Sequence, residues 1–451
     1  MKRSNNIAMR FSIALLLAGF SSCLFFSACQ KNTVVAARQV TPADSSADDE
    51  GLPPEGAADN QIQQPPAVLP TCVRYVDVDS STALKDGLTW ATAFAFVQQG
   101  IDDAAQALQP CEVWVAEGVY LIPGTSKEDT LQLRPGVSVY GGFSGTEIYQ
   151  REREPSSRIT VLDGSNRLFH VVTGSDDSEL NGFHITQGKA DGLLDNRGYG
   201  GGMLNLDCSP RVVNCVFREN QASKNGAGMW NRNGSPRISG CTFRNNQTND
   251  YGGGMANQGA SPAVSGCIFE ANGVEEMGGG IYFQGGNPLI SNTLFIKNRA
   301  THGGGGLAGR ASAVMTVVNC TFTGNQAGLL PISPEPGAIN LDTTSTCSIV
   351  NSIIWADKQP ELDLLHGTYN ITYTTIVGGL LGPGNLPADP QLDEQAGYRL
   401  RAGSPCIDAG DATQAPAADK DDKPRVDDPA TANTGAGNPP FVDMGAYEFN
   451  R

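Results

Sequence analysis

Residues 226–251 read GAGMWNRNGSPRISGCTFRNNQTNDY, and residues 252–277 read GGGMANQGASPAVSGCIFEANGVEEM. Aligned without a gap, the two segments share glycine, methionine, proline, cysteine, phenylalanine and asparagine at matching positions. This period of 26 residues runs from Gly200 to Asn325, with a one-residue slip before Cys320. A fixed period of about 20–50 residues is typical of stacked units that bury a core only through their neighbours.

Each unit contains short apolar segments separated by glycine, asparagine and serine, and none is long enough or helically periodic enough for a helix. The apolar side chains of residues 241–243 alternate as they do in a strand. Ile238 lies three residues before Cys241, so both side chains face inward only if the chain turns a corner between them. Gly228 and Asn246 suit further corners, because glycine and asparagine tolerate unusual backbone angles.

About three short strands per unit, each paired with its copy in the next unit, predict an all-β fold. We expect a right-handed parallel β-helix of roughly ten rungs with a C-terminal extension. Equivalent residues then stack in columns about 4.8 Å apart. A leucine-rich repeat is excluded because its Leu-x-x-Leu-x-Leu pattern is absent, and a calcium-binding nonapeptide roll because aspartate does not follow the Gly-Gly pairs at the required spacing.

The N-terminus has the features of an export signal: basic residues, an apolar run, then small residues and a cysteine. The sequence Phe26-Ser-Ala-Cys29 resembles a bacterial lipobox, which implies a lipoprotein signal peptide over residues 1–28 and lipid on Cys29. The alternative is ordinary secretion with cleavage near Ala28. Residues 29–70 are rich in alanine, proline, aspartate and glutamine without an apolar period, and they are predicted to form a disordered tether.

The chain carries a formal net charge of −16 with 17% charged residues. That balance argues against nucleic acid or an anionic lipid surface as a partner. The membrane is therefore expected to be contacted through the lipid anchor only.

The cysteines of the repeat are predicted to be free thiols. One inward column contains them, and strand spacing of about 4.8 Å holds their Cβ atoms farther apart than the roughly 3.8 Å of a disulfide: Cys215, Cys241 and Cys267. Cys72 and Cys111 are better candidates for a disulfide, which an exported protein can keep. The sequence leaves open whether and how three others pair: Cys208, Cys347 and Cys406.

The first part of the chain resembles bacterial surface β-helix proteins in three segments: residues 74–94, 113–120 and 139–147. The repeats are similar to the Gly-Gly-[Ala/Gly]-[Ile/Met] and Phe-x-x-Asn repeats of the chlamydial polymorphic outer membrane proteins. The C-terminal motifs, residues 403–410 and 442–448, are similar to those of the choice-of-anchor Q domain of surface proteins.

These resemblances imply a fold and a location, a lipid-anchored and surface-exposed position on the outer membrane of a bacterial envelope, and no reaction. The Asp-x-Asp-Gly-x-x-Arg loop that is usual in the choice-of-anchor Q domain appears at residues 419–425 without its glycine. The predicted sections are an N-terminal cap with the first rungs over residues 71–199, the repeat β-helix over residues 200–355, and a choice-of-anchor-Q-like region over residues 356–451.

One charged column of the repeat is a candidate catalytic site for a polysaccharide lyase or glycoside hydrolase, which need carboxyl groups and a base: Lys224, Asp250, Glu276 and His302. Neighbouring rungs bring Asp250 and Glu276 close enough to share a cation or a proton. The alternative interpretation is a solvated column of mixed charges on a loop.

A second column, next to the inward Met229 series, is expected to point outward by strand alternation: Leu204, Trp230, Ala256, Tyr282 and Ala308. Trp230 and Tyr282 then stand two rungs apart, about 10 Å, and suit stacking on the rings of a glycan. The alternative is that a loop or the C-terminal region covers this face. The inward asparagines of the same strands are interpreted as a structural hydrogen-bond ladder: Asn205, Asn231 and Asn257.

An acidic segment near the C-terminus is a candidate Ca²⁺ site, because carboxylate oxygens are hard ligands: Asp419, Asp421, Asp422 and Asp427. Lys420 and Lys423 lie among these residues, and the alternative is a solvated loop without metal. No other cofactor is predicted.

The sequence favours a lipid-anchored surface module that adheres to cells or binds an extracellular glycan. Two alternatives stay open: a polysaccharide lyase or glycoside hydrolase that acts on an extended glycan, and a non-catalytic structural protein of the envelope. No motif specifies the ligand.

Overall fold

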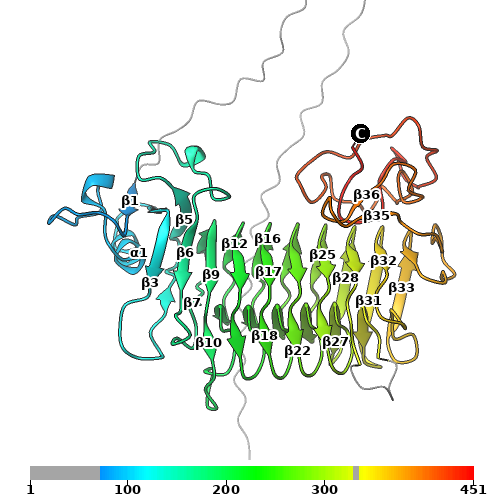
Figure 1. The fold of residues 1–451 in the computed structure, drawn as a ribbon, viewed down its shortest axis with the longest axis horizontal. Coiled ribbons are helices and arrows are strands. Elements are labelled where there is room, and N and C mark those ends of the chain that lie inside the picture. Colours follow the sequence, from blue (N-terminus) through cyan, green and yellow to red (C-terminus); the bar gives the residue numbers. More distant parts are fainter. Residues whose placement is uncertain (1–71, 329–334, 451) are drawn as a thin grey trace, which may run out of the picture. The chain divides into compact units, whose positions relative to one another are not determined.

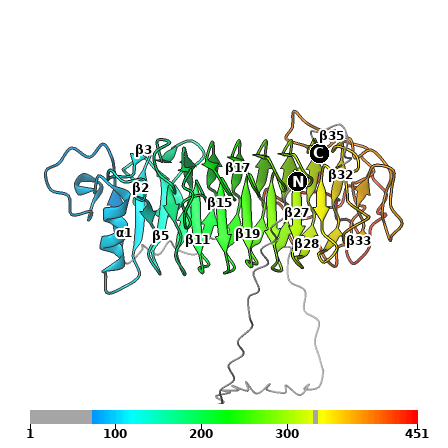
Figure 2. The same ribbon diagram turned by 90° about the horizontal axis from the view of Figure 1, so that it is seen from below.

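The computed structural model describes residues 72–328 and 335–450. The predicted signal peptide, Cys29 and the tether of residues 29–70 lie outside these residues. The described chain winds as a parallel β-helix, as predicted (Figures 1 and 2). Three long sheets and one short sheet run along it, and every pairing between successive rungs is parallel.

The longest sheet, sheet A, has 11 strands. In spatial order its strands are β1 (Val73–Val76), β2 (Glu112–Ala116), β5 (Ser138–Phe143), β8 (Glu179–Asn181), β12 (Arg211–Val213), β16 (Arg237–Ser239), β20 (Ala263–Ser265), β24 (Leu289–Ser291), β28 (Val314–Val318), β31 (Thr346–Val350) and β33 (Thr368–Thr372).

Sheet B follows sheet A around each rung and has 10 strands. They are β3 (Gly118–Leu121), β6 (Thr160–Asp163), β9 (Phe183–Thr186), β13 (Val216–Arg218), β17 (Thr242–Arg244), β21 (Ile268–Glu270), β25 (Leu294–Ile296), β29 (Thr321–Thr323), β32 (Ile353–Trp355) and β34 (Thr375–Ile376).

Sheet C has eight strands and begins each repeat after the glycine cluster. They are β4 (Leu131–Gln132), β7 (Val172–Thr173), β11 (Met203–Leu206), β15 (Met229–Arg232), β19 (Met255–Gln258), β23 (Ile281–Gln284), β27 (Leu307–Arg310) and β30 (Ile339–Leu341).

A short sheet D, which the sequence did not predict, adds a fourth strand to five rungs. Its two-residue strands are β10 (Lys189–Ala190), β14 (Gln221–Ala222), β18 (Gln247–Thr248), β22 (Gly273–Val274) and β26 (Arg299–Ala300). The register confirms the period, since Met229 pairs with Met203 and Met255, and Phe243 pairs with Phe217 and Phe269.

The interior consists of columns of like residues, as the repeat predicts. Adjacent rings of the phenylalanine column lie 4.4 to 5.3 Å apart and almost parallel: Phe217, Phe243, Phe269, Phe295 and Phe322. The thiols predicted to be free are confirmed as free and buried: Cys215, Cys241 and Cys267. The other cysteines without a disulfide in the described residues are also buried: Cys208, Cys320, Cys347 and Cys406.

Two asparagine ladders satisfy polar groups inside the core. At the corner between sheets B and D, the ladder begins at Asn220, and each later side-chain oxygen accepts from the backbone N–H and the side-chain amide of the preceding rung at 2.9–3.1 Å: Asn246, Asn272, Asn298 and Asn325. The ladder predicted in sheet C is confirmed, with amide-to-oxygen distances of 2.7 and 2.8 Å along Asn205, Asn231 and Asn257.

The predicted corner between Ile238 and Cys241 is also present. Gly240 occupies it at φ 62°, and Asn214 and Asn292 occupy equivalent corners at φ 50° and 48°. This left-handed region favours glycine and asparagine, so the residue types at the corner follow from the backbone turn.

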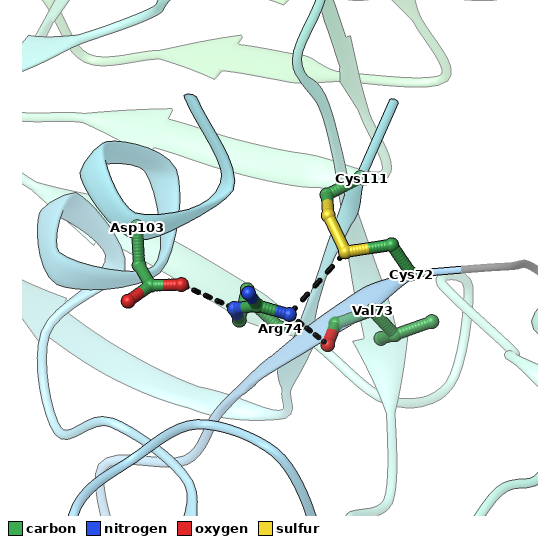
Figure 3. Close-up of a disulfide and its surroundings, with 5 residues drawn as sticks. All are labelled: Cys72, Val73, Arg74, Asp103 and Cys111. Carbon is green, nitrogen blue, oxygen red and sulfur yellow. Dashed lines mark hydrogen bonds and ion pairs between the residues drawn. A yellow bond between two sulfur atoms is a disulfide. The ribbon is translucent and has the colours of Figure 1, made fainter. Parts of the chain in front are cut away.

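The N-terminal end of the β-helix is closed by α1 (Val97–Ala105), which packs against β1, β2 and β4. The disulfide between Cys72 and Cys111, a predicted pair, joins the start of β1 to the start of β2 (Figure 3). Arg74 on β1 forms an ion pair with Asp103 on α1 and donates to the Val73 carbonyl at 3.2 Å (Figure 3). Two 3₁₀ turns, Trp90–Thr92 and Gln150–Glu152, complete this end.

The last part of the chain folds back onto the outer face of sheet B. Residues 391–450, here called the C-terminal region, contain only one strand pair, the antiparallel β35 (Leu392–Asp393) and β36 (Arg399–Leu400). Met444 packs on Ile353 of β32, and Tyr447 packs on Leu294 of β25. Within the described ranges, no helix combines the length and apolarity needed to cross a bilayer.

Candidate functional site

The predicted exposure of the aromatic column is wrong. The Trp230 and Tyr282 side chains do point away from the main core, but they are only 3% and 6% exposed. They belong to a second apolar cluster with Leu204, Ala256 and Ala308. Neither ring offers a free face to a glycan.

The rings are covered by another column of the repeat, which directly precedes the glycine cluster. Tyr199 packs on Trp230 with ring centroids 4.9 Å apart, and Tyr251 packs on Tyr282 at 4.5 Å. Met277 continues this cover on the next rung. Burial raises the pKa of the Tyr282 hydroxyl to about 12, as expected for a phenol removed from water.

The charged column lies at the turn after sheet D. The backbone N–H of Asp250 donates to the Lys224 carbonyl, and that of His302 donates to the Glu276 carbonyl, so the column follows the rungs. The His302 Nδ1 atom lies 3.4 Å from Glu276 Oε2, and both side chains are more than 40% exposed. The column is therefore a solvated edge that contains one carboxylate–imidazole pair.

The predicted Ca²⁺ site is not formed. Asp419 is 2% exposed, and its side-chain oxygens accept backbone N–H groups of Asp421, Lys423 and Glu448 at 2.8, 2.9 and 3.0 Å. Asp421 forms an ion pair with Arg399, while Asp422 and Asp427 are exposed. Asp419 thus stabilises its own loop. Nowhere in residues 72–328 and 335–450 do three His, Cys, Asp or Glu side chains form a group suited to a metal ion.

A groove of about 680 Å³ lies over sheet D. We call it the short-sheet groove. Its floor is the outward column of β14, β18, β22 and β26: Gln221, Gln247, Gly273 and Arg299. The residues before these strands form one rim, Asn245, Ala271 and Lys297, and those after the strands form the other, Asn249, Glu275 and Thr301. The charged column begins one residue beyond the second rim.

One rung on the floor of the groove departs from the repeat. The residue after the ladder asparagine is glutamine on three rungs and arginine on one, whereas Gly273 occupies the rung between Gln247 and Arg299. A Cβ atom at Gly273 would clash with the side-chain amide of Gln247, which lies over the glycine. The missing side chain leaves room for the Gln247 amide, which lies over the Gly273 backbone, so this rung has no outward side chain of its own.

The groove presents hydrogen-bonding groups of both kinds. Gln221 and Gln247 are exposed, and their amides offer donors and acceptors, while Arg299 is exposed and offers only donors. Strand pairing places Gln221 and Gln247 about 4.8 Å apart along the axis and Arg299 two rungs, about 10 Å, beyond Gln247. At the rim, Lys297 pairs with Glu394 of the C-terminal region, and the hydrogen bond to Glu394, followed by that to Tyr398, raises the pKa of the lysine.

Comparison with known proteins agrees with the fold. Residues 171–354 match the family model described as the right-handed beta helix region, which supports the predicted hand. No curated protein matches the sequence.

Among solved structures, the chain is similar to the crystal structure of pectate lyase Pel9A, with 14% identity, a TM-score of 0.48, and 84% of this chain and 97% of that chain covered. It is also similar to PfbA, a surface adhesin of Streptococcus pneumoniae, with 11% identity, a TM-score of 0.24, and 70% and 81% of the two chains covered. Identities and TM-scores this low carry no information about function.

The groove residues were not predicted from the sequence, because their column is neither uniformly charged nor aromatic. The signal was nevertheless present, since each ladder asparagine is followed by a polar residue except at Gly273. Tyr199, Tyr251 and Met277 also recur at multiples of the 26-residue period. This apolar column is the sequence signal that indicates a cover over Trp230.

Trp230→Ala is expected to lower the free energy of unfolding by about 3–5 kcal/mol, because it empties a buried site. Urea unfolding measures this loss. The matched control is Leu193→Ala, which truncates a side chain that is 85% exposed and should change stability by no more than about 0.5 kcal/mol. Equal, small effects of both substitutions would show that the indole is in solvent.

Proposed function

We propose that the protein is a non-catalytic surface module that binds an extended, hydroxyl-rich glycan along the short-sheet groove. The observation that carries the proposal is the groove itself, an open hollow of about 680 Å³ whose floor repeats hydrogen-bonding side chains at the spacing of the rungs. A linear polymer can lie along this column and meet a hydrogen-bonding side chain on three of its four rungs.

The chemistry of the lining favours a glycan over other linear polymers. Sugar hydroxyls both donate and accept, and so do the amides of Gln221, Gln247 and Asn245. A net charge of −16 disfavours the backbone of a nucleic acid. Without exposed aromatic rings on the floor, binding rests on hydrogen bonds, so the affinity per site is weak and adhesion gains from many copies on one surface.

Gln247→Ala and Arg299→Ala are each expected to weaken binding by about 2- to 10-fold, since each removes hydrogen bonds worth about 0.5–1.5 kcal/mol. A glycan array probed with the full chain identifies a ligand, and titration calorimetry with that glycan measures the loss. The matched control is Gln258→Ala, which removes an exposed glutamine from sheet C. Unchanged binding by both groove variants would show that the glycan binds outside the short-sheet groove.

The Glu276–His302 pair lies at the edge of the groove. Because of this pair, one catalytic alternative stays open, in which the protein shortens the glycan that it binds. Analysis of the products of each array hit separates the two functions. Intact glycans after prolonged incubation support binding, and shortened glycans support a lyase or hydrolase. A chain that binds no glycan is left with a purely structural role in the envelope.

We further propose that the module is anchored to a bacterial envelope through lipid on Cys29 and faces the outside of the outer membrane. The support is the lipobox-like sequence of residues 26–29 and the polar composition of the following 29–70 segment. Cys29 lies outside the described residues.

Cys29→Ala is expected to move the protein from the membrane fraction to the soluble fraction, because it removes the attachment atom. Fractionation with immunoblotting measures the shift, and mass spectrometry of the N-terminal peptide detects the lipid. Cys406→Ala is the control, since it removes a thiol of the C-terminal region. The anchor is excluded if the wild-type protein is already soluble.

A further inference from the structure

The C-terminal region contains a buried acidic cluster that the groove does not use. Asp408, Asp443 and Glu448 are 0%, 1% and 2% exposed. The guanidinium group of Arg425, itself almost buried, donates to Glu448 Oε2 at 2.8 Å. Within the described residues, it is the one cation that forms an ion pair with any of these three carboxyls. Three carboxyls thus share one positive charge away from water.

Two of these carboxyls bracket the segment that attaches the region to the β-helix. This segment, residues 442–448, is here called the clasp. The side-chain amide of Asn319 donates to the Asp443 and Gly445 carbonyls at 2.9 and 3.2 Å. The Gly445 N–H donates to the Asn351 carbonyl at 2.7 Å, and the Ala446 N–H donates to Thr321 Oγ1 at 3.1 Å.

The carboxyls also join the clasp to the rest of the C-terminal region. Asp443 Oδ1 accepts from the Asp408 N–H at 2.8 Å, and Asp443 Oδ2 accepts from the Phe449 N–H at 2.6 Å. Glu448 Oε1 accepts from the Val426 N–H at 3.0 Å. Asp408 Oδ2 accepts from the Asp428 N–H at 3.2 Å, whereas its Oδ1 atom is buried without a hydrogen-bond partner.

The surroundings oppose full ionisation of the cluster. The β-helix contributes only neutral groups to these contacts: Asn292, Asn319, Asn351 and Thr321. The C-terminal region contributes Arg425, two cations that lie over the Tyr447 ring of the clasp, Arg399 and Lys420, and further acidic residues that act on the cluster: Asp419, Asp427 and Asp428. An ionised carboxyl in this site is therefore poorly solvated and faces more anions than cations.

We propose that the clasp is a proton-dependent latch, engaged while the Asp408–Asp443–Glu448 cluster holds protons and released when the cluster is fully ionised. Burial, followed by the repulsion of Glu448, raises the pKa of Asp443 to about 8. Burial also raises the pKa of Asp408 to about 6. The pKa of Glu448 is raised as well, because the effect of burial exceeds the opposing effect of the hydrogen bond from Arg425. The latched state binds protons more tightly than the released state, so latching weakens as the pH rises from about 4, the ordinary pKa of a carboxyl group, to about 8.

Release has a consequence at the short-sheet groove. The C-terminal region holds the rim residue Lys297 through Glu394. When the clasp separates from Asn319, Thr321 and Asn351 of the β-helix, the ion pair between Lys297 and Glu394 is free to break. The Lys297 ammonium group then becomes available to a ligand in the groove. The latch thereby links the charge at one rim to pH.

Cys406 is a built-in reporter of the latch. It is fully buried against Ile353 and Met444, whereas Cys241 and Cys267 are buried inside the β-helix. The rate of modification by 4,4′-dithiodipyridine is measured on the full chain from pH 5.5 to 9, relative to the urea-unfolded chain at each pH, so that the intrinsic titration of the thiol cancels. Mass spectrometry assigns the modified residue.

We expect the relative reactivity of Cys406 to rise at least about tenfold between pH 6 and pH 8, since one carboxyl with a raised pKa changes the opening equilibrium by up to about tenfold per pH unit. Cys241 and Cys267 should stay protected throughout. A flat profile for Cys406 in the wild-type chain overturns the latch, and so does release of Cys241 at the same pH, because that result means global unfolding.

Asp408→Asn should make the profile less steep, because it removes one titrating carboxyl of the cluster while Asp443 remains. The amide oxygen can still accept from the Asp428 N–H, and an NH₂ group replaces the partnerless oxygen without a charge. The matched control is Asp422→Asn, which neutralises an exposed carboxyl of the same region and should leave the profile unchanged. Identical profiles for the two variants would contradict the assignment to the buried cluster.

Discussion

The hydrogen-bonded stacking of one rung on the next is the constraint on which the rest of the structure depends. A rung of 26 residues is too small to bury a core alone, so its apolar side chains are shielded only by equivalent side chains one rung away. The asparagine ladder from Asn220 to Asn325 adds a polar condition to this stacking. Each buried amide finds its partner only if the neighbouring rung keeps the same register, and an unpaired buried amide costs about 1–3 kcal/mol. Register is therefore fixed from inside the core.

Fixed register turns small differences between units into surface features. Because every outward position forms a straight column, one residue that departs from the column has a definite neighbour above and below. Gly273 between Gln247 and Arg299 leaves one rung of the groove floor without a side chain, and the left-handed corner residues Asn292 and Asn351 offer the side chains and carbonyls on which the C-terminal region rests. Binding surface and docking surface thus follow from substitutions that leave the core columns unchanged.

Much of the fold could be predicted from the sequence, because the core columns repeat in the sequence itself. The inward positions of Phe243 and Cys241, the corner at Gly240 and the ladder through Asn231 all follow from period and alternation. The orientation of Trp230 followed from alternation as well, but its exposure did not, because exposure depends on the layer of Tyr199 and Tyr251 packed outside the strand. The contact between Asn292 and Ala418 joins residues 126 positions apart, and no local pattern encodes such a contact. The prediction of Asp419 as a metal ligand failed for a similar reason. Backbone N–H groups already bind its side-chain oxygens, and the neighbouring sequence does not indicate these hydrogen bonds.

Gly273→Gln tests most directly whether the rung without an outward side chain is needed for the proposed glycan binding. Gly273 has no left-handed backbone, and the atom that a new side chain would meet first is the flexible end of Gln247, so the substitution should leave the melting temperature nearly unchanged. The measurement is glycan affinity of the full chain beside Ala263→Gln, which adds the same side chain at an exposed position of sheet A. We expect Gly273→Gln to lower the glycan affinity at least tenfold and Ala263→Gln to leave it unchanged. Wild-type affinity in a folded Gly273→Gln protein would contradict it.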